Sequence, residues 1–305
     1  MIARRSQRAG LPEIWTVWVL FGLATVAVFE TYWRIPPSQL WKVHNSGFVG
    51  GIGRAFVFAG FSPAVAAFAV LPIVADRLDD RRADVVALVA FLLCATVGFV
   101  QTPSHLDPKW SNAYPVVGVA LAVALTSWAT RRGRREAVRT SRAGDRARLA
   151  LGGVTLFFAA PYIAAELGFH LDGVPVLGWI FQTGKIRPEP GAGYSHAAVH
   201  YGHHHGLDGF LLVVTALLLS RLLGGIRRPG LRPLTAAILS LLLVYGWTNQ
   251  VEDLWIEQIV KRGWTSWQVP DVLFPKPSLA WAAMLVAAAL VYAGCFARRP
   301  LLGRA

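Results

Sequence analysis

The chain has 305 residues, of which 54% are hydrophobic and 15% are charged, and its mean hydropathy is +0.46. A soluble domain carries roughly 25% charged residues, so this balance argues against a soluble domain and indicates a membrane protein. The net charge of +13 comes from clusters between apolar stretches, without the aromatic-interleaved basic surface that nucleic-acid binding needs, so we expect no nucleic-acid partner.

Apolar stretches predict the transmembrane helices, each about 16–22 residues long. They lie near residues 14–33, 56–75, 83–100, 114–130, 149–169, 208–224, 234–249 and 278–297. About 20 residues cross a hydrocarbon core of about 30 Å. We therefore expect an all-α, polytopic integral membrane bundle of about eight transmembrane helices, with residues 1–305 forming one transmembrane domain.

The basic residues predict the orientation of this bundle. About 21 of the 30 Lys and Arg residues lie at the two chain ends and in alternate connections, which the positive-inside rule places in the cytoplasm. The first apolar stretch follows "MIARRSQR" without a small-residue cleavage site, which predicts a retained helix rather than a signal peptide. We expect a multi-pass plasma-membrane protein with both termini cytoplasmic and its basic surface against anionic lipids.

Three outer segments have a distinct composition. The stretch 45–63 is glycine-rich and apolar, which predicts a re-entrant or tightly packed start of the second span. The stretch "EDLWIEQIVKRGW" has the amphipathic spacing of a short surface helix, and we interpret its acids Glu252, Asp253 and Glu257 as a solvated face. The outer connection 170–207 carries a cluster of histidines.

All eight histidines fall on the predicted outer side, and five of them lie within "HAAVHYGHHH" at residues 196–205. The "PEPGAG" stretch breaks the chain before this run, and Ser195 is a suitable N-cap for a helix that continues into the sixth span. In such a helix His196, His200, His203 and His204 share one stripe about 100° wide. Four imidazoles on one stripe at a membrane interface predict a metal site.

A second set of ligands is expected on the preceding helix. Glu166 and His170 are four residues apart at the outer end of the fifth span, and helical bundles build metal sites from such pairs on facing helices. A carboxylate inside a membrane is costly unless it is paired, hydrated or bound to metal. Asp208 and Glu30 are therefore candidates for an acid/base role or for orienting an imidazole. Two plainer interpretations of the histidines remain, a structural or hydrated helix start and a proton-sensing cluster.

Imidazole and carboxylate ligands suit Fe, Cu or Zn, and the positions of the two cysteines within apolar stretches exclude a thiolate site. "HAAVH" and "HYGHH" are similar in spacing to the histidine boxes of integral-membrane desaturases and hydroxylases, which bind two irons. Here the two boxes share His200 and are predicted to face outward, whereas that family keeps separate, cytoplasm-facing boxes, so we assign the chain to no family on this spacing.

The sequence predicts a membrane-embedded metalloenzyme with an extracytoplasmic site. Its substrate would be a lipid or another apolar molecule, with oxidation favoured over hydrolysis. The alternatives are a metal- or proton-coupled transporter and a membrane subunit that binds haem or another cofactor. A transport path needs ionisable groups at mid-membrane depth, and the sixth and seventh predicted spans carry few. The sequence leaves open whether a partner subunit completes the site.

Overall fold

A computed structural model of the protein describes residues 11–34, 44–100, 107–133, 142, 144–167, 173–180, 186–188, 195–197, 204–260, 263–270, 272–273 and 275–297. Side chains are described over the same ranges except at residues 165–166, 179–180, 186–188, 195–197 and 204–205. Within these ranges, eight helical segments are long and apolar enough to cross a membrane. The predicted helical class and the predicted number of spans are confirmed.

In chain order the elements are α1 (Pro12–Arg34), α2 (Gly47–Ala59), α3 (Ser62–Leu78), α4 (Arg81–Ala95), α5 (Val97–Val100), η2 (Trp110–Asn112), α6 (Ala113–Arg132), α7 (Asp145–Glu166), α8 (Leu177–Ile180), β1 (Ile186–Pro188), β2 (Ser195–Ala197), α9 (His204–Ser220), η3 (Leu223–Gly225), α10 (Leu231–Trp255), η4 (Ile256–Val260), α11 (Leu279–Tyr292) and η5 (Ala293–Ala297). The turns η4 and η5 are π-helical and directly extend α10 and α11.

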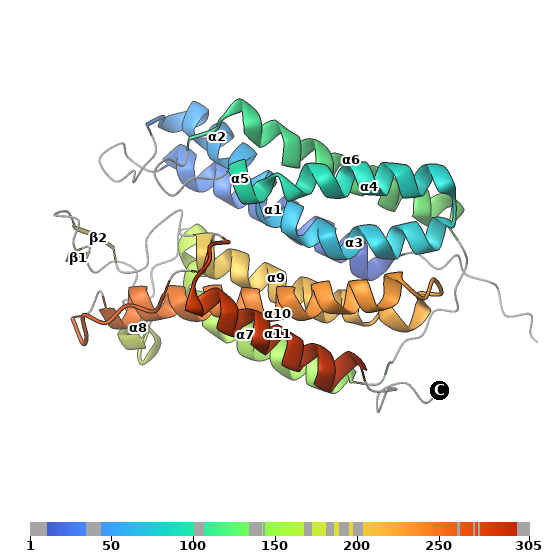
Figure 1. The fold of residues 1–305 in the computed structure, drawn as a ribbon. Coiled ribbons are helices and arrows are strands. Elements are labelled where there is room, and N and C mark those ends of the chain that lie inside the picture. The colour runs from blue at the N-terminus through green and yellow to red at the C-terminus, as the bar shows by residue number, and fades with distance from the viewer. Residues whose placement is uncertain are drawn as a thin grey trace, which may run out of the picture.

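The helices form two layers, each built from one half of the chain (Figure 1). Helices α1 to α6 make the first layer, where the indole N–H of Trp18 on α1 donates to the Thr126 hydroxyl on α6 at 3.0 Å. Helices α7, α9, α10 and α11 make the second layer. The layers meet where α1 and α3 pack against α9, and α3 against α10. Buried aliphatic side chains such as Ile14, Val70 and Leu212 fill the core between them.

The second span consists of two consecutive helices, α2 and α3, with a break in the helix at Gly60 and Phe61. The glycine-rich stretch expected to be re-entrant or tightly packed forms α2 and packs closely on α1. A Cβ atom placed on Gly51 would lie 2.7 Å from the backbone oxygen of Phe29, so only glycine allows this approach.

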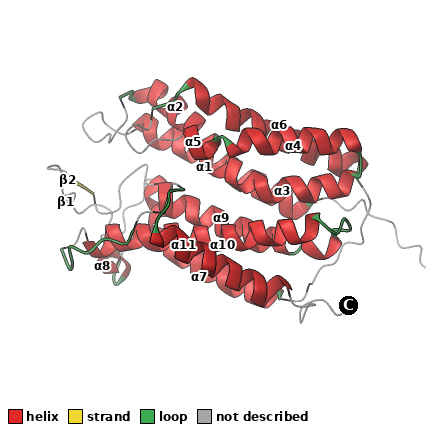
Figure 2. Cartoon of the chain, in the orientation of Figure 1, coloured by secondary structure: helices red, strands yellow, loops and turns green. Residues whose placement is uncertain are grey.

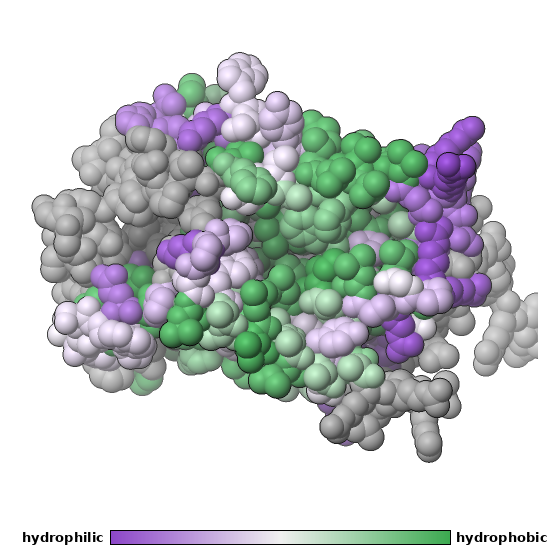
Figure 3. Space-filling view, in the orientation of Figure 1, coloured by the Kyte–Doolittle hydropathy of each residue, from purple (hydrophilic) through white to green (hydrophobic). Residues whose placement is uncertain are grey.

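Described arginines and aspartates of the α3–α4 connection, the α9–α10 connection and the start of α7 lie together at one end of the bundle, which we call the arginine end (Figure 3). The Asp76 carboxylate accepts hydrogen bonds from the backbone N–H groups of Arg227 and Arg228, at 3.1 and 2.8 Å. The Arg228 guanidinium forms ion pairs with Asp79 and Asp84, and the hydrogen bond that it donates to Asp84 raises the pKa of Arg228 above its usual value. These contacts join α3 and α4 to the α9–α10 connection, so charged groups fasten the two layers at this end.

The opposite end, where α7 ends and α9 begins, carries His44 and His204, and we call it the histidine end. The short antiparallel pair of β1 and β2 also lies there, with Arg187 opposite His196 (Figure 2). An apolar surface separates the two ends on the face that Figure 3 shows, as expected for a bundle surrounded by hydrocarbon.

Candidate metal centre

Helices α7 and α9 come into close contact beside the first turn of α9. Glu166 is the last residue of α7 and His204 is the first residue of α9. One turn before Glu166, the fully buried ring of Tyr162 lies against Gly206: a Cβ atom on Gly206 would be 2.4 Å from two of its ring carbons. The backbone therefore brings the end of the fifth span and the start of the sixth together at Gly206, directly after the histidine run.

Helix α10 also contacts the first turn of α9, through Asp253. One carboxylate oxygen of Asp253 accepts a hydrogen bond from the backbone N–H of Gly206. The first N–H groups of a helix have no acceptor within the helix, and the helix dipole favours a negative charge beside them. Asp253 thus fixes the first turn of α9 from a helix 47 residues farther along the chain.

Four carboxylates on α9, α10 and η4, all within a few residues of Gly206 or Asp253 in the chain, are buried. Asp253 and Glu257 are only 2% and 1% exposed, and Asp208 and Glu252 are buried as well. The Tyr162 hydroxyl lies within electrostatic range of Asp253 and Glu257. The interpretation of residues 252, 253 and 257 as a solvated face is wrong. The seventh span does not end near residue 249 but continues to Val260, which carries these acids into the bundle.

A second polar contact continues this region along α7 and α10. The Thr155 hydroxyl donates to the Gln250 side-chain oxygen at 2.6 Å, and the Gln250 amide donates to the Thr155 backbone carbonyl at 2.8 Å. Both side chains are buried. Because Gln250, Asp253 and Glu257 recur at helical spacing, they form one polar stripe of α10 and η4 that contacts α7 and α9.

Helices α9 and α10 approach closely just below the first turn of α9. A Cβ atom on Gly209 would lie 2.5 Å from the backbone oxygen of Gly246, and one on Gly246 would lie 2.7 Å from the oxygen of Gly209. Such small-residue contacts let membrane helices pack backbone to backbone. They hold the start of α9 in a fixed position against α10.

The predicted metal ligands are only partly covered by the described structure. The backbones of Glu166, His196 and His204 are described and their side chains are not, whereas His170, His200 and His203 lie outside the described residues. The predicted helix from Ser195 is wrong at residues 195–197, which form β2. Residues 189–194 are rich in Gly and Pro, which favours a chain reversal, and pairing with β1 satisfies backbone groups that a helix start would leave open. His196 therefore does not share a helix with His204.

Of the two predicted acid/base residues, Asp208 lies at this meeting point and Glu30 lies in the other layer. Asp208 is buried in the second turn of α9. Glu30 is half-exposed near the end of α1, where it forms an ion pair with Arg34 at 2.9 Å. His44, also in the first layer, has both its backbone N–H and its ring nitrogen Nδ1 bound to the Asp107 carboxylate.

Among the side chains that the structure describes, no group of three or more His, Cys, Asp and Glu residues could hold a metal ion. Tyr162, Asp253 and Glu257 are the residues of this region that sequence reasoning missed. The helical spacing of Gln250, Asp253 and Glu257 was a usable signal, because it continues the seventh span as a helix with one polar face.

No protein-family model, no curated protein and no solved structure gives a significant match to the chain. Its own features show a multi-pass membrane protein with buried acids near the start of α9.

Proposed function

We propose that the protein is a membrane-embedded metalloenzyme with its metal centre at the histidine end. The ligands come from His196, His200, His203 and His204 on one side and from Glu166 and His170 on the other. The substrate is a lipid or another apolar molecule that reaches the site from the outer leaflet, and the reaction is an oxidation or a hydrolysis. The arginine end faces the cytoplasm, and the chain lies in the plasma membrane.

The observation that carries this proposal is the convergence of α7, α9 and α10 beside His204. Tyr162 and Asp253 both contact Gly206, so the helix that ends at Glu166 lies against the helix that begins at His204. Asp253 binds Gly206 directly, and three further carboxylates close to these two residues in the chain, those of Asp208, Glu252 and Glu257, are also buried. Acidic side chains inside membrane-spanning segments commonly mark ion or substrate sites, which supports a metal ion at this end of the bundle.

The chemistry follows from the donor types. Imidazoles with a carboxylate suit Fe, Cu or Zn, and these metals supply redox chemistry or activate a bound water. Asp208 is our candidate for accepting or delivering a proton, and its burial one helical turn after His204 supports this role. Asp253 positions the first turn of α9 through the Gly206 N–H. Glu30, which pairs with Arg34, is the weaker candidate for an acid/base role.

Elemental analysis of protein purified without chelator tests the proposal. We expect at least one equivalent of Fe, Cu or Zn in the unaltered protein. We expect well below one equivalent in His200→Ala and in Glu166→Ala, which remove ligands from the two sides separately. His105→Ala serves as the matched control, because it removes an outer histidine that the proposal leaves unassigned. A metal-free parent protein, or variants that both retain metal, would contradict the proposal.

The buried polar stripe of α10 favours a second candidate function, proton- or metal-coupled transport. Gln250, Asp253 and Glu257 place ionisable and hydrogen-bonding groups inside the bundle, where transporters hold their coupling ions. Proteoliposomes that contain a pH-sensitive dye distinguish the two functions. A transporter would acidify the lumen upon addition of metal or of a proton gradient, and Asp253→Asn would abolish this signal. A metalloenzyme without a transport path would give no flux.

A further inference from the structure

At the arginine end, two arginines form ion pairs with acidic side chains of the same chain. Arg228 forms ion pairs with Asp79 and Asp84, and Arg221 forms ion pairs with Glu13 and Asp145. These contacts neutralise the acids of this end with arginines of the same chain. They leave few carboxylates for the remaining exposed arginines.

Arg81 and Arg82, at the start of α4, differ from these paired arginines. Both side chains are exposed, and neither guanidinium has a hydrogen-bond or ion-pair partner among the described residues. The neighbouring carboxylate, Asp80, caps α4 by accepting hydrogen bonds from the backbone N–H groups of Arg82 and Ala83, at 2.7 and 3.2 Å. The helix start is therefore already capped, and the two guanidinium groups remain for an external anion.

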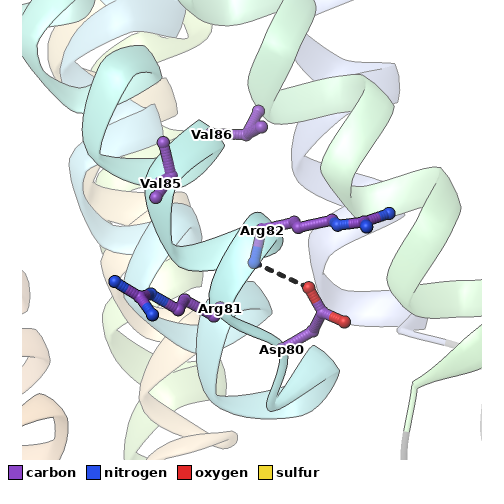
Figure 4. A pocket seen from close by; sticks show the side chains of 5 residues that line it. All are labelled: Asp80, Arg81, Arg82, Val85 and Val86. Carbon is purple, nitrogen blue, oxygen red and sulfur yellow. Dashed lines mark hydrogen bonds between the residues drawn. The ribbon is translucent and has the colours of Figure 1, made fainter.

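A shallow surface pocket of about 520 Å³ lies at this helix start. It is lined by Asp80, Arg81, Arg82, Val85 and Val86. Figure 4 shows the two arginines extending to opposite sides of the helix start, with the valines one turn farther along α4. The pocket thus joins a cationic rim, of which Asp80 offsets one charge, to an apolar surface.

The apolar surface continues from this pocket along α4. Val85, Leu88 and Leu92 are 56%, 59% and 58% exposed. Together with Arg81 they recur at helical spacing, so they form one outward stripe that begins at a cation and continues as aliphatic side chains. Because α4 is one of the candidate membrane spans, this stripe faces the hydrocarbon of one leaflet and its arginine lies at headgroup depth.

We propose that this surface is a binding site for one anionic phospholipid. The phosphate lies in the pocket on the Arg81 side of the helix start, an acyl chain covers Val85, Leu88 and Leu92, and Arg82 adds its positive charge from the other side of the helix start. A diacyl phospholipid satisfies both halves of the surface, whereas a free phosphate would leave the apolar stripe without a partner. The site does not depend on the proposed metal centre, which lies at the other end of the bundle.

The preference for an anionic headgroup follows from the two arginines. Each basic residue near an anionic membrane surface strengthens binding by about fivefold, so loss of both weakens it by roughly 25-fold. A zwitterionic lipid carries no net charge and gains little from them. Cytoplasmic leaflets are the anionic ones, in agreement with the orientation proposed from the positive-inside rule.

Native mass spectrometry of the detergent-purified protein, titrated with phosphatidylglycerol, tests the site. The unaltered protein is expected to retain one phosphatidylglycerol more tightly than phosphatidylcholine. Arg81→Gln/Arg82→Gln is expected to weaken this binding by roughly 25-fold. The matched control is Arg227→Gln/Arg232→Gln, which removes two exposed charges from the same end outside the pocket and is expected to bind as the parent does.

Two further measurements complete the test. Thermal unfolding without added lipid shows whether both double variants are folded, and folded variants are the ones compared. Titration with inorganic phosphate separates the lipid from a free anion. Equal loss of phosphatidylglycerol binding in both double variants, equal binding of phosphatidylcholine, or stabilisation by inorganic phosphate alone would overturn the proposal.

Discussion

Gly206→Ala is the substitution that tests the meeting of α7, α9 and α10 most directly. The added Cβ atom would lie 2.4 Å from the Tyr162 ring and 2.7 Å from an Asp253 carboxylate oxygen, whereas ordinary contacts begin at 3.4 Å. The ring must therefore move by about 1 Å, although it is fully buried. Overpacking of this kind costs about 1–3 kcal/mol. Displacement of Asp253 from the Gly206 N–H adds about 1.5–3 kcal/mol, because the acceptor is charged.

We therefore expect Gly206→Ala to destabilise the protein by about 2.5–6 kcal/mol. Tryptophan fluorescence during thermal unfolding in detergent measures this change. Gly153→Ala on α7 is the control, because a Cβ atom there meets nothing within 4 Å, and it is expected to be neutral or slightly stabilising. The double variant Gly206→Ala/Tyr162→Ala should be more stable than the sum of the single effects predicts. Unchanged stability of Gly206→Ala would refute the close contact of the three helices.

Three further outcomes follow from the same structure. Thr155→Val removes the hydroxyl that donates to Gln250 and should cost about 1–3 kcal/mol in thermal unfolding, whereas Thr155→Ser should cost less; equal costs would contradict this hydrogen bond. Asp76→Ala should lower the free energy of unfolding by at least about 1–3 kcal/mol, because two backbone N–H groups lose their acceptor. Asp76→Asn should retain part of this stability. An Asp76→Ala variant as stable as the parent would show that these groups find another acceptor. Chelator should lower the unfolding midpoint of the parent and leave His200→Ala unchanged, because a metal stabilises only the state that binds it, and an unshifted parent would argue against the metal centre.

The spans were predictable because membrane insertion depends on the length of an apolar stretch, which the sequence states directly. It was also predictable that alternate connections lie at the same end of the bundle, because consecutive spans run in opposite directions. The end of the seventh span was not predictable from apolarity alone. Asp253 and Glu257 lower the local hydropathy, and only the packing of α7 and α9 against α10 shows that these acids are buried rather than hydrated.

At the candidate site, the location of the metal centre stays a prediction, and the sequence missed the local geometry of the residues that the structure describes there. Ser195 has the features of a helix N-cap, yet residues 195–197 pair with β1, because a strand partner outside the local sequence satisfies their backbone. Gly206 looked like an incidental residue within a histidine run. Its importance comes from Tyr162, 44 positions earlier, and Asp253, 47 positions later, and no local pattern reports such distances. The metal ligands themselves stay a prediction.

The position of Asp76 in the chain determines when the two layers can be joined during synthesis. The two N–H groups that its carboxylate accepts are synthesised 151 and 152 residues later. At about 5–20 residues per second, a ribosome takes roughly 8–30 seconds to reach them. During this interval the Asp76 carboxylate lacks these two donors, so the contact between the two layers that they form cannot yet be made. Final assembly of the bundle therefore waits for the connection after the sixth span to leave the ribosome.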